Sequence, residues 1–231
     1  MTNQLVRLVI LSLTIVTNAI LINGQTNLLK NPNADLQSRF WRAYGEATVE
    51  SCATSNPCFV VRNGGYFLQD VALPAGAVGQ YALFFGRGAS ERINSDGVIT
   101  GLPYLYGYMM PEVSPRGGRI LDYLQGQNMR ASATRENEWV PMWGIFRVPE
   151  GTGAVRFFLD QALRNGVPHT GSAARFDDVG LYLFATEQEA RAFVNARHQS
   201  TPSNKSLDAS GGGLFLNVIR PAMLDLVRAA A

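Results

Sequence analysis

The stretch EWVPMWGIFRVPEGTGAVRFFLD, residues 138–160, contains two candidate strands separated by one turn. Trp139–Val148 and Ala154–Asp160 are rich in aromatic and β-branched residues, which favour strands. Pro149-Glu150-Gly151 between them has the composition of a tight turn. Alternate positions of the second run form an apolar set and a mixed set, namely Val155, Phe157 and Leu159 against Arg156, Phe158 and Asp160. This period of two predicts a strand with one face in the core.

The same pattern of strand and turn repeats between Asn27 and Phe184. About ten candidate strands follow one another: Phe40–Tyr44, Ala47–Ser51, Cys58–Arg62, Tyr66–Leu73, Gln80–Gly86, Tyr104–Met110, Arg119–Gln125, Trp139–Val148, Ala154–Asp160 and Arg175–Phe184. No helix long enough for a crossover separates them, which favours antiparallel pairing. We therefore predict an all-β fold, an antiparallel β-sandwich of the jelly-roll type with a short C-terminal helix and tail.

The run Arg175–Phe184 is apolar on both faces near its end, which is typical of a central strand in a fold of two layers. Strict alternation predicts two sets of residues, with Phe176, Asp178, Gly180, Tyr182 and Phe184 on one face and Val179, Leu181 and Leu183 on the other. The neighbours Asp177 and Asp178 would then point to opposite faces, so we do not expect them to act as a catalytic pair.

The composition describes one folded domain of ordinary size with short terminal extensions. The chain has 231 residues, of which 46% are hydrophobic and 16% charged, so disorder is not expected. The formal net charge is +2, and the 20 Lys and Arg residues are scattered along the chain. Because no basic stripe could follow a phosphate backbone, we do not expect nucleic acid as a partner.

The N-terminus has the pattern of a secretory signal. Arg7 precedes the apolar stretch Leu8–Ile22, and small or polar residues follow it. This predicts a signal peptide at residues 1–24 and a secreted, extracellular protein, with cleavage after Gly24 or, alternatively, after Ala19. A retained membrane anchor is the other interpretation, but the stretch of about 15 residues is shorter than the roughly 20 that a bilayer requires, so we expect no stable membrane span.

After the strands the sequence changes character. Thr186 and Glu189 have the spacing of a capping box and predict a helix over Glu187–His198. The polar stretch Ser200–Gly213 reads as a linker and contains a glycosylation sequon at Asn204. The domain boundaries predicted from these signals are a signal peptide (1–24), a sandwich (25–185), a helix (186–199), and a flexible linker and tail (200–231). A lipid-anchor signal in the tail is an alternative that its charged residues disfavour.

Two cysteines follow the signal, Cys52 and Cys58. In an oxidising compartment, close neighbours of this kind can close a short loop, and Ser55-Asn56-Pro57 supplies a turn between them. We predict a disulfide, with two unrelated thiols as the alternative. His169 and His198 lie far away in the sequence, which argues against a metal site that includes the cysteines.

One strand carries a row of tyrosines. In PYLYGYMM, residues 103–110, Tyr104, Tyr106 and Tyr108 fall on one face. Aromatic rings on a half-exposed sheet face can stack against sugar rings, and Gln125 from the following strand is a candidate for binding hydroxyl groups. The alternative is that the tyrosines simply cover the sheet with their hydroxyl groups in water.

Three segments resemble a known family when they are taken in order. They are NLLKNPNAD (27–35) followed by Trp41, QDVALPAGAVGQYALFFGRG (69–88), and EWVPMWGIFRVPEGTGAVRFFL (138–159) leading to RFDDVGLYL (175–183). Together they are similar to the landmarks of carbohydrate-binding modules in the galactose-binding-domain-like superfamily. The resemblance implies a jelly roll that binds a glycan or polysaccharide without catalysis.

The resemblance also implies further site residues. Trp41 and Trp139 match positions at loop ends, where they line a cleft or pack in the core, and Arg87 ends a strand from which it could reach a hydroxyl group. Asp35, Asp177 and Asp178 match positions that commonly hold a structural calcium ion, since calcium prefers oxygen ligands. The alternative is that Asp35 caps a turn and the other two acids form hydrogen bonds.

No motif in the sequence indicates catalysis. Serine, histidine and acidic residues are present, but no nucleophile elbow or pair of spaced catalytic carboxylates is recognisable. We therefore expect a non-catalytic, lectin-like module and not an enzyme. The alternative hypothesis is an extracellular structural or protein-interaction sandwich that binds no sugar. The sequence leaves the oligomeric state open.

Overall fold

The structure, a computed structural model, describes residues 25–52, 56–93, 99–114, 118–131, 135–161 and 172–199. The strands are β1 (Arg42–Ser51), β2 (Pro57–Ala72), β3 (Tyr81–Ser90), β4 (Arg92–Ile93), β5 (Ile99–Thr100), β6 (Pro103–Met110), β7 (Asp122–Leu124), β8 (Val140–Arg147), β9 (Ala154–Gln161) and β10 (Ala173–Phe184). The helices are the 3-10 turn η1 (Gln127–Met129) and α2 (Glu187–Gln199). The predicted signal peptide, the sequon at Asn204 and the tail lie outside the described residues.

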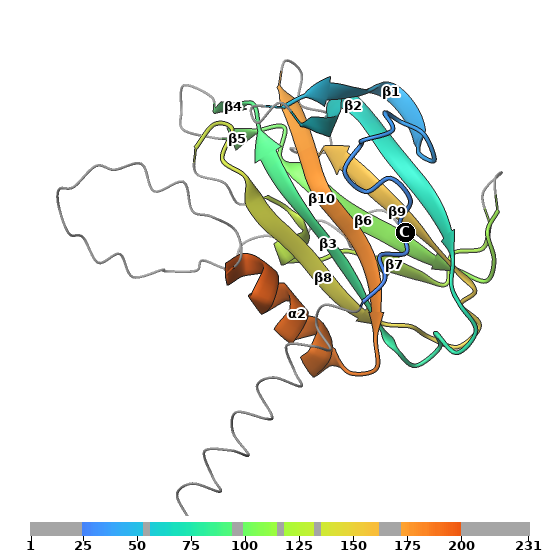
Figure 1. Cartoon of the computed structure of the whole chain (residues 1–231). Helices are drawn as coiled ribbons and strands as arrows, with labels where there is room; N and C mark the ends of the chain where they lie inside the picture. Colours follow the sequence, from blue (N-terminus) through green and yellow to red (C-terminus); the bar gives the residue numbers. More distant parts are fainter. Residues whose placement is uncertain are drawn as a thin grey trace, which may run out of the picture. The chain divides into compact units, whose positions relative to one another are not determined.

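The prediction of an antiparallel sandwich is confirmed. An eight-stranded sheet has the order β7-β6-β9-β2-β10-β3-β8, and β1 pairs with β2. β2 pairs with β10 through Phe59–Arg62 and with β9 through Tyr66–Ala72, so its two halves belong to different layers. Figure 1 shows β9, β6 and β7 behind β10, β3 and β8. β8 and β9, which are consecutive in the sequence, therefore lie in opposite layers.

The bend that lets β2 join both layers lies at Asn63 and Gly64, whose φ angles are 48° and 77°. β1 bends beside it at Gly45, and a Cβ at Gly65 would lie 2.7 Å from the Glu46 backbone, so that position needs glycine. The prediction of two strands on either side of Asn63-Gly64-Gly65 was wrong, because these residues bend one strand and do not reverse the chain. For the same reason Phe40–Tyr44 and Ala47–Ser51 are replaced by one strand, β1.

The two layers meet through aromatic rings in the core. Phe84 of β3 is stacked on Phe157 of β9 with 4.8 Å between the ring centroids and 4° between the planes. Gly107 of β6 makes this approach possible, because a Cβ there would lie 2.6 Å from the Phe84 ring. Val155, Phe157 and Leu159 are all buried in this core, as their alternation predicted.

A bulge in β10 overturns part of the predicted alternation. The register against β3 shifts between Asp177 and Gly180, and Asp178 has a φ of 52°. As a result Phe176 lies in the same core cluster as Val179 and Leu181, although strict alternation predicted that it would lie on the opposite face. Tyr182 and Phe184 pack in a separate cluster on the outer side of the sheet.

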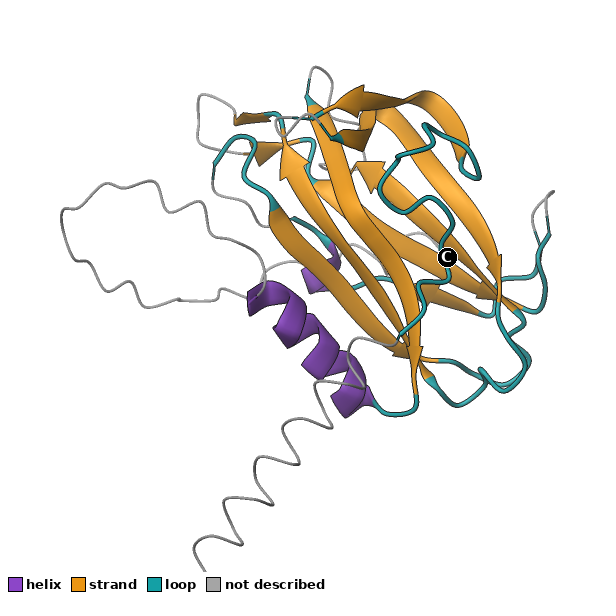
Figure 2. Cartoon of the chain, in the orientation of Figure 1, coloured by secondary structure: helices purple, strands orange, loops and turns teal. Residues whose placement is uncertain are grey.

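Helix α2 covers the outer side of the layer formed by β10, β3 and β8, as Figure 2 shows. Phe193 and Val194 of the helix pack there against Leu83 and Phe85 of β3. The predicted capping box is present, since the Thr186 amide donates to Glu189 Oε2 at 3.0 Å and the Glu189 amide donates to Thr186 Oγ1 at 3.2 Å. No helix in the described part of the chain is both long and apolar enough to cross a membrane.

The predicted disulfide joins Cys52 and Cys58, whose Cα atoms are 5.9 Å apart. It packs in a small cluster with Val60 and Ala173 and with the partly buried Trp139. The strand predicted over Arg119–Gln125 is confirmed only for the three residues of β7, and the short pair β4 and β5 was not predicted.

Candidate functional site

The tyrosine row of β6 lies on the outer side of its layer, as predicted. Tyr104, Tyr106 and Tyr108 are half-buried, whereas the alternating residues Leu105 and Met109 are fully buried in the core. Helix α2 packs on the other layer and therefore does not cover these tyrosines. The row therefore forms part of an accessible sheet face.

The strand register extends this row across five strands. Tyr106 of β6 lies opposite Phe158 of β9, and Tyr108 lies opposite Tyr123 of β7. On the other side of β9, Asp160 lies opposite Tyr66 of β2, and Tyr66 lies opposite Tyr44 of β1. We call the resulting set the aromatic face; it consists of Tyr44, Tyr66, Tyr104, Tyr106, Tyr108, Tyr123 and Phe158. It holds six of the chain's eight tyrosines, the others being Tyr81 of β3 and Tyr182 of β10.

The rings of the aromatic face contact one another in a continuous series. The tightest pair is Tyr106 and Phe158, with centroids 4.4 Å apart and planes 5° apart. The other centroid distances are 5.3 Å for Tyr104–Tyr106, 5.9 Å for Tyr106–Tyr108, 5.0 Å for Tyr108–Tyr123, 5.0 Å for Tyr108–Phe158, 5.9 Å for Tyr66–Phe158 and 4.8 Å for Tyr44–Tyr66. Such contacts hold each ring in place, so the face is organised before any ligand arrives.

Exposure differs along the series. Tyr123 at one end is 62% exposed and Tyr44 at the other is 42% exposed, whereas Phe158 in the middle is buried. Because parallel neighbours cover each other's ring faces, the centre offers mainly ring edges and hydroxyl groups. The two ends offer open ring surface on which an apolar ligand face could stack.

One carboxylate lies within the aromatic face. Asp160 of β9 lies opposite both Tyr66 and Tyr104 in the register, and it accepts a hydrogen bond from the Tyr106 hydroxyl. Burial raises the pKa of Asp160, and burial together with this carboxylate raises the pKa of Tyr106 well above its usual range. Tyr106 therefore stays protonated as a donor, and Asp160 offers acceptor oxygens in the middle of the face.

A charged group borders the aromatic face beside Tyr108. Arg156 Nε donates to Asp70 Oδ1 at 2.6 Å, and Arg156 also donates to the Ser114 carbonyl at 2.6 Å. Arg42 binds the other oxygen of Asp70. The hydrogen bond to Asp70 raises the pKa of Arg156, so this guanidinium stays charged and fixed at the edge of the face.

Two polar side chains lie beside Tyr104. Its hydroxyl donates to Gln125 Oε1 at 3.2 Å, so Gln125 lies near the tyrosine row, as predicted. The guanidinium of Arg130 lies 4.7 Å from the centroid of the Tyr104 ring. Arg130 was missed because its approach depends on the loop after η1, for which the sequence offers no signal.

The other predicted ligand-binding residues lie elsewhere. Trp41 is 6% exposed and packs in the core against Phe59, with Nε1 donating to the Asn31 carbonyl at 3.1 Å. Trp139 packs near the disulfide, and Arg87 lies on β3 opposite Asp177, in the layer that carries α2. Since none of these three belongs to the aromatic face, we leave them out of the candidate site.

The three acids predicted to hold calcium lie close enough to influence one another. Burial raises the pKa of Asp177, and the charges of Asp178 and Asp35 raise it further. The opening segment does run beside the closing strand, as the calcium hypothesis requires, because the Leu28 amide donates to the Leu181 carbonyl at 2.8 Å. Within the described ranges, however, no three His, Cys, Asp or Glu side chains form a group that could hold a metal ion. Calcium binding stays a prediction.

No protein-family model matches this chain, and no curated protein matches it either. Solved structures with a similar fold include a domain of bacteriophage CBA120 tailspike protein 4, which is 14% identical with a TM-score of 0.46; the match covers 68% of this chain but only 21% of the tailspike chain. Others are TmCBM61 in complex with β-1,4-galactotriose (19% identity, 69% and 98% covered, TM-score 0.40) and the CBM22-1 xylan-binding domain of Paenibacillus barcinonensis Xyn10C (11% identity, 70% and 97% covered, TM-score 0.47). At these values the likeness concerns the general fold, so we infer function from the residues.

Proposed function

We propose that this protein is a secreted, non-catalytic carbohydrate-binding module that binds an extended glycan along the aromatic face. The observation that carries the proposal is the continuous contact of six tyrosines and Phe158 across five strands of one layer. This layer is the one that α2 does not cover.

The chemistry of the face suits a sugar. Pyranose rings present apolar C–H groups that pack on aromatic rings, and Tyr123 and Tyr44 offer exposed ring surface for this contact. Sugar hydroxyl groups need both donors and acceptors. Asp160 supplies acceptor oxygens, Arg156 supplies a fixed cation, and the tyrosine hydroxyls supply both functions.

The exposed groups favour a hydroxylated ligand over an apolar protein partner. The large hydrophobic side chains that are markedly exposed in the described residues are Leu36, Phe40, Tyr44, Val78, Val113 and Tyr123. Only the two tyrosines of this set belong to the aromatic face, and its one aliphatic neighbour in the register, Leu68, is buried. Among the described residues, the aromatic face therefore offers an apolar partner no exposed aliphatic side chain.

Two further observations support secretion and the absence of catalysis. The Cys52–Cys58 disulfide is consistent with an oxidising, extracellular environment. Hydrolysis of a glycoside requires two suitably spaced carboxyl groups, and Asp70, the acid at the edge of the face, is held by Arg42 and Arg156. Because Asp70 is held in these ion pairs, we do not pair it with Asp160 as a second catalytic carboxyl group, and we assign Asp160 to hydrogen bonding with the ligand.

The proposal is tested by a glycan array, followed by calorimetry with the glycan that binds best. Tyr106→Ala removes the centre of the face, and Tyr81→Ala is the matched control in the opposite layer. We expect Tyr106→Ala to reduce affinity at least tenfold and Tyr81→Ala to leave it unchanged. If no glycan binds, or if both variants bind as well as the native protein, the proposal is wrong.

A further inference from the structure

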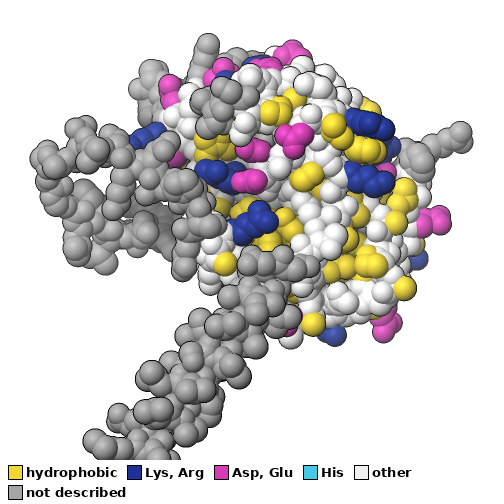
Figure 3. All heavy atoms as spheres, in the orientation of Figure 1, with side chains coloured by type: hydrophobic (Ala, Val, Ile, Leu, Met, Phe, Trp, Pro, Cys, Tyr) yellow, Lys and Arg dark blue, Asp and Glu magenta, His cyan; other side chains and the backbone are white. Residues whose placement is uncertain are grey.

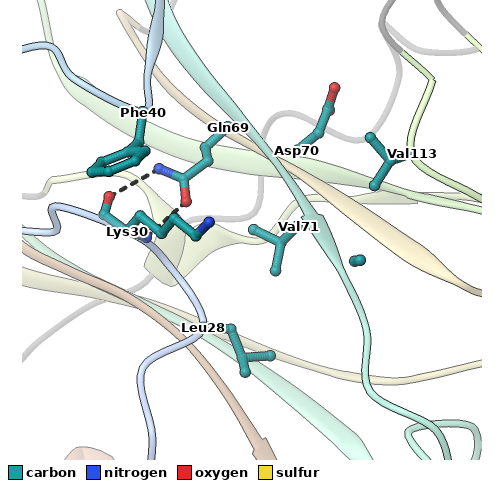
Figure 4. A pocket seen from close by; sticks show the side chains of 8 residues that line it. Leu28, Lys30, Phe40, Gln69, Asp70, Val71 and Val113 are labelled. Carbon is teal, nitrogen blue, oxygen red and sulfur yellow. Dashed lines mark hydrogen bonds between the residues drawn. The ribbon is translucent and has the colours of Figure 1, made fainter.

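A second candidate site lies beyond the edge of the aromatic face. β1 pairs with β2 only as far as Leu68, so the β2 edge from Gln69 to Ala72 faces the N-terminal segment instead. A pocket of about 410 Å³ lies there between the segment and β2 (Figure 4). Its lining includes Leu28, Lys30, Phe40, Gln69, Asp70 and Val113.

One wall of the pocket is fixed by a buried side chain. Gln69 is 6% exposed, and its Oε1 accepts from the Lys30 amide at 2.7 Å while its Nε2 donates to the Lys30 carbonyl at 3.0 Å. This pair holds the Lys30 backbone against β2. Figure 4 shows the Lys30 side chain extending from that point toward Val71 and not back toward its own segment. The amino group is thus presented to the pocket.

An exposed ring lies beside Gln69 and Lys30, as Figure 4 shows. Phe40 is 46% exposed and has a φ of 75°, which lies in the left-handed region that bulky residues rarely adopt. The loop is held in this form by Asn31, whose Nδ2 donates to the Gln37 carbonyl at 2.7 Å, and by the Trp41 bond to the Asn31 carbonyl. The fold therefore maintains a solvent-facing aromatic ring on a strained backbone at the pocket, and such strain is concentrated at functional sites.

Positive charge surrounds this ring. The Lys30 amino group lies 5.5 Å and the Arg39 guanidinium 5.0 Å from the centroid of Phe40. Neither cation forms an ion pair with any of the described residues. In the space-filling view, basic and hydrophobic side chains lie together on the side where β1 and the N-terminal segment lie (Figure 3).

The acid that lines the pocket does not neutralise these cations. Asp70 is held by Arg42 and Arg156, and Figure 4 shows its carboxylate directed away from Lys30. The pocket consequently combines an exposed ring with Lys30, and Arg39 lies over the same ring outside the pocket lining; neither cation is paired with an acid among the described residues. A neutral sugar needs the ring alone, whereas a sugar that carries a negative charge uses both.

We propose that this pocket binds an acidic sugar residue, one bearing a carboxylate or a sulfate ester, in the glycan that lies along the aromatic face. The inference rests on the proposed function and specifies its substrate class as acidic polysaccharide. Asp70 lies opposite Arg156 in the register, and Arg156 lies opposite Tyr108, so the pocket and the aromatic face are adjacent and one chain can occupy both.

The test compares ligands that differ only in charge. Oligogalacturonates and the same oligomers with their carboxyl groups reduced to alcohols form the carboxylate pair, and dextran sulfate with dextran forms the sulfate pair. We expect the native protein to bind the acidic member of at least one pair about tenfold more tightly in dilute buffer. High salt should weaken this preference, because exposed charges are screened.

Two variants test whether Lys30 and Arg39 cause the preference for the acidic ligand. Lys30→Met keeps the side-chain stem and removes its charge, and Arg39→Gln removes the second cation. We expect each variant to reduce the preference for the acidic ligand several-fold and to leave the affinity for the neutral ligand unchanged. Arg147→Gln, at an exposed cation on β8 in the opposite layer, is the control and should change neither affinity.

The outcomes separate the two proposals. Equal binding of acidic and neutral ligands, or a preference that survives both Lys30→Met and Arg39→Gln, would overturn the inference about the pocket. In that case, binding of a neutral ligand that is lost in Tyr123→Ala would still uphold the proposed function. Acidic binding that depends on Lys30 and ignores Tyr123→Ala would uphold the pocket and overturn the role of the aromatic face.

Discussion

The rings of Tyr106 and Phe158 lie parallel on adjacent strands, with 4.4 Å between their centroids. This pair links the tyrosines of β6 to those of β2 and β1, since Phe158 also contacts Tyr66. Without Phe158 the tyrosines would form two separate groups on either side of β9. The pair therefore turns local rows of tyrosine into one surface that spans the layer.

Stacking on the ligand is expected at the exposed end of the face. Tyr123→Ala should weaken glycan binding about tenfold, because an aromatic contact is worth roughly 0.5–1.5 kcal/mol beyond the area it buries. Tyr123→Phe keeps the ring and should bind almost as well as the native protein. Calorimetry measures both affinities, and equal losses for the two variants would show that the hydroxyl group matters and the ring does not.

The buried acid predicts a dependence of stability on pH. Because burial raises the pKa of Asp160 above its usual value of 3.8, its contribution to stability is greatest when it is protonated and is lost as the pH rises through the raised pKa. Asp160→Asn keeps the shape without the charge. Relative to this variant, the free energy of unfolding of the native protein should fall between acidic and neutral pH. Urea titrations across that range would contradict the prediction if the difference stayed constant.

The close approach of the layers is testable at Gly107. A Cβ there would lie 2.6 Å from the Phe84 ring, so Gly107→Ala should lower the free energy of unfolding by about 1–3 kcal/mol. At Gly126 the nearest atom would lie 3.9 Å away, and Gly126→Ala should be tolerated. Denaturant unfolding of both variants provides the comparison; similar stabilities would mean that the layers are packed less tightly than described.

Calcium binding can be tested through stability. If Asp35, Asp177 and Asp178 help to hold the ion, calcium should raise the Tm of the protein, a chelator should reverse the rise, and Asp177→Asn should abolish it. Asp122→Asn, at an exposed acid on β7, is the control. A Tm that is the same with calcium and with chelator would rule out a structural ion.

Local patterns in the sequence were sufficient to predict which faces of the strands are buried. Alternation placed Val155, Phe157 and Leu159 in the core and brought the β6 tyrosines to one half-exposed face. The prediction failed where a single residue leaves the extended conformation. The bulge at Asp178 moved Phe176 to the face opposite to the predicted one, and the bend at Asn63 and Gly64 made one strand of the two predicted.

The wider site could not be predicted, because it depends on pairing between distant strands. Tyr66, Phe158 and Tyr106 lie far apart in the sequence and meet only because β9 lies between β2 and β6. No local property of these residues specifies that order. Local sequence also did not determine the position of Trp41, since a tryptophan beside a loop is equally compatible with a cleft and with the core that it occupies.

The most direct test of the glycan-binding face uses the tyrosines themselves. In NMR spectra of the tyrosine rings, addition of the best glycan from the array should shift the signals of Tyr44, Tyr66, Tyr104, Tyr106, Tyr108 and Tyr123. The signals of Tyr81 and Tyr182, which lie in the opposite layer, should stay in place. Shifts confined to Tyr81 and Tyr182, or no shift in any ring at saturating glycan, would contradict binding along the aromatic face.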